Sequence, residues 1–292
     1  MAGIDFRQCD ITQFEETTQA LEGVDLVIHA AIVQIPLINE RKRLGYEVNI
    51  LGTQNVCEAV YRSTTAKGLL LTSTWHVFGE RRLHGIINEV FGYRPDNVEK
   101  RAQIYALCKI AQETIVRIYD QMSEKIYGGI RLGTVLGEGM PEKTAANIFI
   151  SKGLRGEALT PYKHSMYRPM LYVDIKDVCR AFENFAKKIL GNKTEYEKNG
   201  TTYIVNLFWP YPITILDLAY LIMETIIKQS NGKIRPNIEI METEEQGTNN
   251  PEDKELLKVD ITNTKKLLNL TQLTDPAQTI ERIVKHKILS YS

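Results

Sequence analysis

Tyr105 and Lys109 form a pair whose residue types and spacing suit proton transfer to and from an alcohol. They lie in IYALCKIAQETIVRIYDQM, where apolar residues recur at helical spacing, and residues four apart share one flank of a helix. A tyrosine hydroxyl has an ordinary pKa of about 10, and a nearby ammonium group favours its ionised form. We therefore expect Lys109 to lower the pKa of Tyr105. Such a phenolate can take the hydroxyl proton of an alcohol while a hydride leaves the same carbon.

Tyr-Lys pairs are also common on solvated helix flanks, so the pair needs support from a second segment. LLLTSTWHVFG provides that support, because it is typical of an apolar strand that ends in hydroxyl residues. Open α/β sheets bind their ligands at the carboxyl ends of their strands. We therefore expect Thr74 to be the third member of the site, hydrogen-bonded to the reacting oxygen.

The first half of the chain alternates short apolar runs with helical patterns. DLVIHAA is followed by a helical pattern around VNILGTQNVCEAVYRS and then by GLLLTSTW, which predicts a βαβ unit. Strands that are apolar throughout indicate a parallel sheet covered on both faces. In the helix that carries Tyr105, we expect one apolar stripe to pack on this sheet: Ile104, Leu107, Cys108, Ala111, Ile115, Ile118 and Met122.

The bulk composition excludes several classes of protein. Lys+Arg and Asp+Glu each number 36, so the chain lacks the overall positive charge typical of nucleic-acid binding. The four cysteines lie far apart, which argues against both a disulfide framework and a metal site. No apolar run reaches the roughly 18 residues of a membrane span, and the first ten residues have no signal-peptide pattern. We expect a soluble, cytoplasmic protein that binds neither nucleic acid nor membrane.

The order of strand, hydroxyl cluster, loop and Tyr-x-x-x-Lys helix resembles the short-chain dehydrogenases/reductases, nearly from end to end of the chain. The details are most similar to the extended branch, the NAD-dependent epimerases and dehydratases. TSTWHVFG resembles the Ser-Ser-x-x-x-Val-Tyr-Gly segment of that branch, with Thr74 at the catalytic Ser/Thr position. The resemblance implies an α/β fold with a Rossmann-like parallel sheet. It also implies that Tyr105 is the acid/base and that Lys109 tunes Tyr105 and binds ribose.

Further segments resemble those that hold NAD or NADP in the family. Cys9-Asp10-Ile11 resembles the acidic turn that meets adenine, His29-Ala30-Ala31 the strand end beside the cofactor, and YEVNILGTQN the Asn-x-x-Gly-Thr helix. RLGTVLGEG resembles the strand and loop that pass the nicotinamide. The resemblance thus implies these cofactor contacts: Asp10, Ile11, His29, Ala30, Ala31, Asn49, Thr72, Tyr105, Lys109, Leu132 and Gly133. The residue types leave other roles open, since Asp10 or Thr12 suits the N-cap of a following helix, and we expect His29 to be mainly structural.

For substrate binding, the resemblance implies Thr74, Thr134 and Arg168. RPMLYVDIKDVCRA is similar to the Arg-x-x-x-x-Val-x-Asp-x-Ala segment, which would bring Arg168 to the substrate, although a surface ion pair is the alternative. Nucleotide-sugar relatives usually have Asn at the position of Thr134. No arginine occurs from Pro236 to Glu281, so the usual diphosphate clamp is absent or rebuilt. The basic cluster of Lys163, His164 and Arg168 is a candidate replacement, with a solvated loop as the alternative.

The chain departs from the family pattern at its beginning. A dinucleotide fold starts with a strand, a Gly-rich turn and a helix whose N–H groups hold the pyrophosphate. MAGIDFRQCDI instead resembles the third strand, so the first βαβ segment and its Gly-rich loop are missing. We hypothesise that Met1 is an internal start. Without the missing strands, either the segment from Ile4 to Gln8 pairs with DLVIHAA, or buried strands gain open edges. We expect weak NAD or NADP binding, and the residues that distinguish the two cofactors would lie in the missing segment.

These observations support one leading function and two alternatives. The first is an NAD(P)-dependent epimerase or dehydratase acting on a nucleotide sugar. The second is an alcohol/ketone dehydrogenase of the hydroxysteroid or dihydroflavonol type. Such an enzyme would consume or produce NAD(P)H in each reaction cycle, which distinguishes it from an epimerase or dehydratase. The third is a cofactor-sensing or truncated protein without catalysis.

The expected organisation has two parts. Residues 1–140 would form an incomplete NAD(P)-binding Rossmann domain, and residues 141–292 a mainly substrate-binding region, a smaller α/β lid. A strand near 203–209 would return to the Rossmann sheet. The helices of VNILGTQNVCEAVYRS and IYALCKIAQETIV are candidates for the interface of a homodimer.

Overall fold

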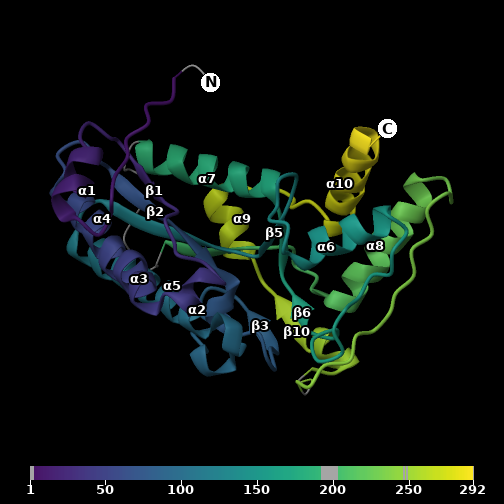
Figure 1. Ribbon diagram of the computed structural model, residues 1–292. Coiled ribbons are helices and arrows are strands. Elements are labelled where there is room, and N and C mark those ends of the chain that lie inside the picture. Colours follow the sequence, from purple (N-terminus) through teal and green to yellow (C-terminus); the bar gives the residue numbers. More distant parts are fainter. Residues whose placement is uncertain (1–2, 192–202, 246, 248, 292) are drawn as a thin grey trace. The chain divides into compact units, whose positions relative to one another are not determined.

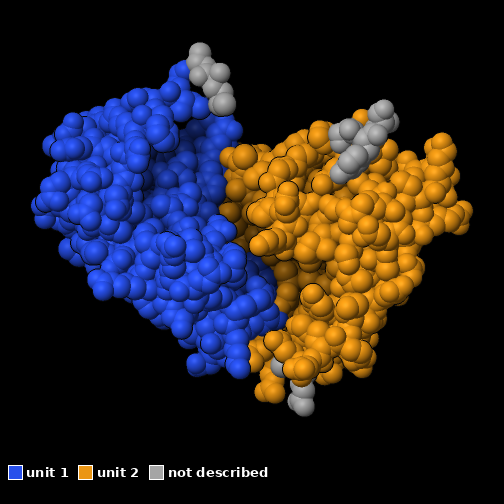
Figure 2. All heavy atoms as spheres, viewed as in Figure 1, with its two compact units in different colours: residues 1–77, 93–131, 182–205 blue, residues 78–92, 132–181, 206–292 orange. Residues whose placement is uncertain are grey.

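The computed structural model describes residues 3–191, 203–245, 247 and 249–291 (Figure 1). The chain divides into two compact units, shown in different colours in Figure 2. Unit 1 comprises residues 1–77, 93–131 and 182–205, and unit 2 comprises residues 78–92, 132–181 and 206–292. Both units therefore draw on segments that are distant in the sequence.

A four-stranded sheet of order β1-β2-β4-β8 forms the centre of unit 1. Its strands are β1 (Val27–His29), β2 (Gly68–Thr74), β4 (Ile126–Leu132) and β8 (Ile204–Leu207). β1 runs parallel to β2, with Ile28 opposite Leu70. β2 and β4 are buried along nearly their whole length, as expected for strands covered on both faces. The prediction of a Rossmann-like parallel sheet is confirmed.

The segment from Ile4 to Gln8 resembles a sheet strand in sequence. In the described part of the chain it forms no strand and pairs with none. Its apolar side chains are solvated, with Ile4 72% and Phe6 85% exposed. β1 is therefore the edge strand of the sheet, and Ile28 on it is 50% exposed. Of the two arrangements considered from the sequence, the open edge is the one observed.

Helices of unit 1 cover one face of the sheet. The helical segments that precede β4 are α1 (Phe14–Ala20), α2 (Leu37–Glu40), α3 (Lys42–Tyr46), the π-helical turn η1 (Glu47–Leu51), α4 (Gly52–Arg62), the 3-10 turns η2 (Trp75–Phe78), η3 (Pro95–Asn97) and η4 (Lys100–Ala102), and α5 (Gln103–Met122). α4 and α5 pack against each other and both contact β2 (Figure 1). Between them and the sheet lies an apolar core that includes Val60, Leu69, Val116 and Tyr127.

Two glycines let α7 (Ile175–Leu190) approach the sheet closely through its residues 182–190. A Cβ atom at Gly128 would lie 2.7 Å from Cζ of Phe185, and one at Gly68 would lie 3.0 Å from Cγ2 of Ile189. A side chain at Gly128 would displace the Phe185 ring. At Gly68 the nearest atom is the backbone oxygen of Ile126 on β4, closer than Ile189, so the neighbouring strand also restricts this position. The glycines are therefore packing positions rather than parts of a binding loop.

Unit 2 contains short strand pairs and three long helices. Its remaining elements are β3 (Gly85–Ile87), β5 (Thr134–Leu136), α6 (Ala145–Leu154), β6 (Pro169–Met170), β7 (Tyr172–Asp174), β9 (Ile213–Thr214), α8 (Ile215–Gln229), η6 (Pro251–Lys254), β10 (Leu257–Val259), α9 (Thr262–Leu268) and α10 (Pro276–Tyr291). β10 pairs with β3 and β5 with β7, both in parallel, whereas β6 and β9 are antiparallel. α8 packs against both α6 and α10. Thr214 begins α8 with a capping box: its hydroxyl accepts from Asp217 N, and the Asp217 carboxylate accepts from Thr214 N.

Candidate active site

α5 buries its polar flank, not the apolar stripe expected from the sequence. Lys109, Gln112 and Glu113 are at most 2% exposed, whereas Leu107 and Met122 of the stripe are 45% and 59% exposed. The prediction that the stripe packs on the sheet is therefore wrong for Leu107, Ile118 and Met122, whereas Cys108 of the stripe is buried and Ile115 packs against the apolar core. The polar flank can be buried because each of these side chains has a hydrogen-bond partner. This orientation turns Tyr105 and Lys109 toward the carboxyl end of β2.

Tyr105 and Thr74 lie together at that strand end. Burial raises the pKa of Tyr105 to about 12, while hydrogen bonding with Thr74 acts in the opposite direction. The expectation that Lys109 lowers the pKa of Tyr105 is wrong for this structure, because the burial effect dominates. At neutral pH the tyrosine is therefore a neutral hydroxyl that can donate a proton.

Lys109 is held one helical turn further along α5. Its ammonium nitrogen donates to the carbonyl oxygen of Thr72 at 2.6 Å. Burial lowers the pKa of Lys109 to about 8, and the charge of Glu113 partly offsets this effect. Thr72 thus contributes through its backbone, and the three predicted catalytic residues Thr74, Tyr105 and Lys109 are gathered in unit 1.

Glu113 and its partners form a buried network next to these residues that sequence reasoning did not identify. Arg131 donates to both carboxylate oxygens of Glu113, and the hydroxyls of Ser73 and Tyr93 donate to the same carboxylate. Arg131 and Glu113 are 1% and 0% exposed. The network joins α5 to β2 and β4. The available signal was the position of Glu113, four residues after Lys109 on the same flank.

His29 and Asn49, both predicted to lie near the cofactor, make structural hydrogen bonds. His29 Nε2 lies 2.8 Å from Oγ1 of Thr53, and burial lowers the pKa of His29 to about 4, so its ring is neutral at pH 7. Asn49 accepts from Val33 N at 2.7 Å and donates to Val33 O at 3.2 Å. Asn49 therefore fixes the loop that follows β1. Ala30 and Ala31, at the end of that strand, are exposed.

Asp10 and Ile11 belong to the turn before α1. The Asp10 carboxylate accepts from both the backbone N and the hydroxyl of Thr12, each at 2.9 Å. The N-cap position of α1 is Gln13, which makes no side-chain capping bond, so the capping role considered for Asp10 or Thr12 is not observed. The carbonyl of Ile11 accepts from Asn55 Nδ2 at 2.9 Å, which anchors the turn to α4.

Four other predicted site residues fall in unit 2. Leu132 ends β4, and Gly133 follows it where a Cβ atom would lie 2.7 Å from the Leu171 carbonyl oxygen. Thr134 N donates to the same carbonyl at 2.6 Å. Arg168 is buried, with Nη1 3.7 Å from Oε1 of the buried Glu80.

The basic cluster near Lys163 is largely neutralised. Lys163 Nζ lies 2.8 Å from Oε1 of Glu242, and His164 Nε2 lies 3.5 Å from Oε2 of Glu245. Because Glu242 already balances its charge, Lys163 is a poor candidate for a diphosphate clamp. Arg168, the third member of the cluster, differs from them because it is buried and lies beside the buried Glu80.

A sequence model of the NAD dependent epimerase/dehydratase family matches residues 1–196. The chain belongs to this family. A curated relative, the UDP-glucose 4-epimerase of Rickettsia canadensis, is 25% identical over 178 residues, which are 60% of this chain and 46% of that protein. The match therefore spans about half the length of the relative.

Solved structures with the same fold include further members. The UDP-glucuronic acid 4-epimerase from Bacillus cereus, in complex with UDP-glucuronic acid and NAD, superposes with a TM-score of 0.69 at 19% identity, covering 95% of this chain and 80% of that one. The Thermus thermophilus UDP-glucose 4-epimerase complex with NAD gives a TM-score of 0.68 at 19% identity, covering 98% and 85%. At these identities the likeness establishes the fold.

The described residues fit one end of a nicotinamide dinucleotide better than its middle. Tyr105, Thr74 and Lys109 offer hydroxyl and amine groups at the carboxyl end of β2, suited to a ribose and a reacting carbonyl or alcohol. A pyrophosphate needs backbone N–H groups at a helix start. In the described ranges, no Gly-rich turn joins a strand of the four-stranded sheet to a helix.

No group of three or more His, Cys, Asp or Glu side chains within the described ranges is arranged to hold a metal ion. Over the same ranges, no helix is both long and apolar enough to cross a bilayer. All four cysteines are free thiols, and Cys57 and Cys108 are buried.

Proposed function

We propose that this chain carries the proton-transfer site of an NAD-dependent epimerase that acts on a nucleotide sugar. The observation that carries the proposal is the meeting of Thr74 and Tyr105 at the end of β2, beside Lys109, in a member of the epimerase/dehydratase family. In its ionised form Tyr105 takes the proton of a sugar hydroxyl while the carbon gives up a hydride, and it returns the proton when the ketone is reduced; Thr74 hydrogen-bonds the same oxygen. Lys109 binds ribose hydroxyls from its position at the Thr72 carbonyl. Bound NAD supplies a hydride acceptor.

The names of the relatives support a UDP-sugar as the substrate. The Rickettsia relative and both solved structures are epimerases of UDP-glucose or UDP-glucuronic acid. We assign Thr134 and the buried Arg168 to substrate binding, with Arg168 as the cation that faces phosphate. Under this proposal, residues 1–140 bind the cofactor and residues 141–292 mainly bind the substrate.

Cofactor contacts are proposed at the carboxyl side of the sheet. Ala30, Ala31, Leu132 and Gly133 would offer backbone surface to the dinucleotide, and Asp10 and Ile11 would approach adenine. Asn49 and His29 would act indirectly, by holding the loop after β1 and the start of α4. Because the described residues offer no Gly-rich turn at a helix start to hold the pyrophosphate, NAD binding is expected to be weak.

The test is a product assay with millimolar NAD and either UDP-glucose or UDP-glucuronic acid. The proposal predicts the corresponding 4-epimer, at a rate that rises with NAD concentration, without net accumulation of NADH. Accumulation of NADH in proportion to an oxidised sugar would identify a dehydrogenase instead. A folded chain that forms no product with either sugar at any NAD concentration would contradict the proposal.

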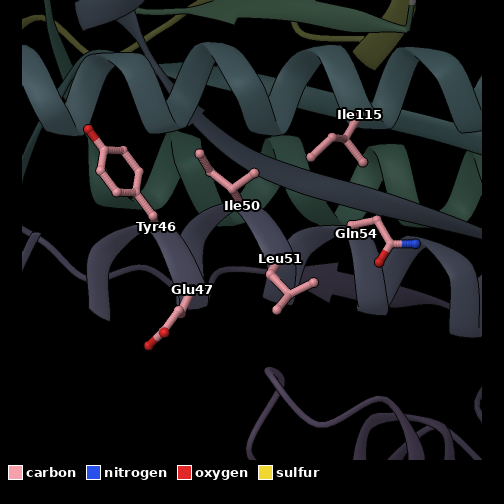
Figure 3. Close-up of a pocket in the computed structure, with 6 residues that line it drawn as sticks. All are labelled: Tyr46, Glu47, Ile50, Leu51, Gln54 and Ile115. Carbon is pink, nitrogen blue, oxygen red and sulfur yellow. The ribbon is translucent and has the colours of Figure 1, made fainter. Parts of the chain in front are cut away.

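We also propose that the chain forms a homodimer through α5 and the neighbouring η1 segment. The exposed apolar residues Leu107, Ile118 and Met122 continue along α5, while Tyr46 at the end of α3 and Leu51 on η1 are 40% and 47% exposed. Between the two elements lies a surface depression (Figure 3), lined by Tyr46, Glu47, Ile50, Leu51, Gln54 and Ile115. A second copy fits this surface because a two-fold interface pairs identical patches, and an apolar patch complements itself.

Sedimentation equilibrium tests the dimer. The parent chain is expected to sediment as a dimer and the Ile118→Glu variant as a monomer, because a carboxylate would be buried without a partner. Tyr220→Glu, at an exposed site of unit 2, is the matched control and should leave the dimer intact. A monomeric parent, or a dimer that Ile118→Glu does not weaken, would overturn this assignment.

A further inference from the structure

His76 lies against the Thr74 hydroxyl and the Tyr105 ring. Its ring Nδ1 is 2.9 Å from Oγ1 of Thr74, and its ring meets that of Tyr105 edge-on, with centroids 5.8 Å apart at 88°. η2 begins directly after β2, and this tight 3-10 turn folds residue 76 back over residue 74. His76 is partly exposed, whereas Thr74 is 6% exposed. The histidine therefore lies next to the reacting groups without being part of the packed core.

The hydrogen bonds of Thr74 can be counted atom by atom. A threonine hydroxyl has one proton to donate and two lone pairs that accept. The backbone N of His76 donates to Oγ1 of Thr74 at 3.4 Å, and the ring Nδ1 approaches the same oxygen. If Nδ1 carries a proton, both lone pairs are taken and the only free direction for the Thr74 proton is outward, toward Tyr105. If Nδ1 is bare, it takes the Thr74 proton and none remains for Tyr105.

The role proposed for Thr74 distinguishes these cases. Thr74 is assigned to hydrogen-bond the reacting sugar oxygen, and a carbonyl oxygen at that position can only accept, so Thr74 must be the donor. Thr74 can act as that donor only while its proton is not given to His76, whose Nδ1 lies 2.9 Å away. The proposed function therefore requires an Nδ1–H group on His76.

We propose that His76 is a positioning residue, which donates from Nδ1 to Thr74 and so directs the single Thr74 proton to the oxygen of Tyr105 or of the substrate. This inference deepens the proposed function and rests on it. The chain of donors runs from His76 to Thr74 to Tyr105. Without it, the Thr74 hydroxyl rotates freely and presents its proton to the reacting oxygen only part of the time.

Nitrogen NMR of the five histidines tests the proposal on the chain as it is, without cofactor or turnover. Long-range ¹H–¹⁵N spectra at pH 8 report which ring nitrogen is protonated, and His76→Asn identifies the signals of His76. We expect Nδ1 of His76 to be protonated. In Thr74→Val, the acceptor is lost and the proton should move to Nε2. In Thr74→Ser, the acceptor is kept and the proton should stay on Nδ1.

His164 provides an internal control, because its Nδ1 lies 2.8 Å from a different threonine, Thr243. Its signals should not change in the Thr74 variants. A bare Nδ1 on His76 in the parent chain would overturn the proposal. It would also be overturned if Thr74→Val left the position of the His76 proton unchanged. Neither result depends on whether the chain turns over a sugar, so failure of this inference is separate from failure of the proposed function.

A kinetic comparison adds a second readout once epimerase activity has been measured. His76→Leu removes the donor and should lower kcat about tenfold, the cost of about one misdirected hydrogen bond, with little change in KM. His76→Asn places an amide N–H near the position of Nδ1 and should restore much of the rate. Equal activity of the parent and the His76→Leu variant would contradict the positioning role.

Discussion

Arg131 on β4 donates to both carboxylate oxygens of Glu113 on α5, from Nε to Oε1 at 2.9 Å and from Nη2 to Oε2 at 2.8 Å. This buried pair ties the helix that bears Tyr105 and Lys109 to the sheet that bears Thr74. Glu113→Gln would leave the guanidinium buried without a charge partner, and we expect it to lower the free energy of unfolding by about 3–5 kcal/mol. Urea denaturation monitored by circular dichroism measures the change.

Glu157→Gln is the control for that variant. Glu157 also pairs with an arginine, Arg155, but on the surface, where the loss of an ion pair has little effect. If both glutamine variants are equally stable, the buried pair does not have the role assigned to it.

The stability of the chain should fall in mild acid because of His29. Burial lowers the pKa of His29 to about 4, from an unfolded value of 6.5. The unfolded chain therefore takes up a proton between these values and the folded chain does not. The contribution of His29 to the free energy of unfolding is fully present above pH 6.5. It decreases by about 3 kcal/mol as the pH falls toward 4. Urea midpoints at pH 7 and pH 4.5 should differ less in His29→Asn than in the parent, and equal pH dependence would count against the assignment.

Lys109→Met should separate catalysis from stability. The substitution removes the ammonium that donates to Thr72, and we expect the epimerisation rate to fall roughly a hundredfold or more. The free energy of unfolding should change by less than about 1 kcal/mol, because the lost hydrogen bond is offset by relief from burying a charge. Assays and urea melts of the same preparation test both parts. A large loss of stability would mean that Lys109 serves mainly the fold.

NAD binding to this chain should be weak. In the described ranges, no Gly-rich turn leads from a strand of the four-stranded sheet into a helix whose N–H groups could hold the pyrophosphate, so calorimetry should give a Kd of about 1 mM or weaker. A micromolar Kd for NAD would show that other groups of the chain hold the pyrophosphate.

The sequence was informative wherever strand and helix patterns were strong. The apolar run of β2 and the hydroxyls at its end predicted the strand and the site of Thr74, and the four-residue spacing predicted that Tyr105 and Lys109 share a flank. The orientation of α5 was mispredicted because periodicity assumes that apolar residues face the core. Here Glu113, Gln112 and Lys109 are buried instead, paired with groups distant in sequence that a local pattern does not reveal.

Two other features depended on tertiary structure. The pKa of Tyr105 is set by burial, and burial follows from how α5 packs rather than from the neighbouring lysine. The contact of His76 with Thr74 depends on the 3-10 turn of η2, which an apolar pattern does not specify. Ile4 and Phe6 have the composition of a strand, but without a paired neighbour in the sheet they remain exposed.

The most direct test of the central claim is the epimerisation rate of Tyr105→Phe beside that of Tyr220→Phe, with UDP-glucose at saturating substrate and millimolar NAD. Phenylalanine keeps the ring but removes the hydroxyl that exchanges the proton, so Tyr105→Phe should be slower than the parent by about a hundredfold or more. Tyr220 is an exposed residue of α8, and its variant should match the parent. A Tyr105→Phe variant that is folded and as active as Tyr220→Phe would contradict the assignment of proton transfer to Tyr105.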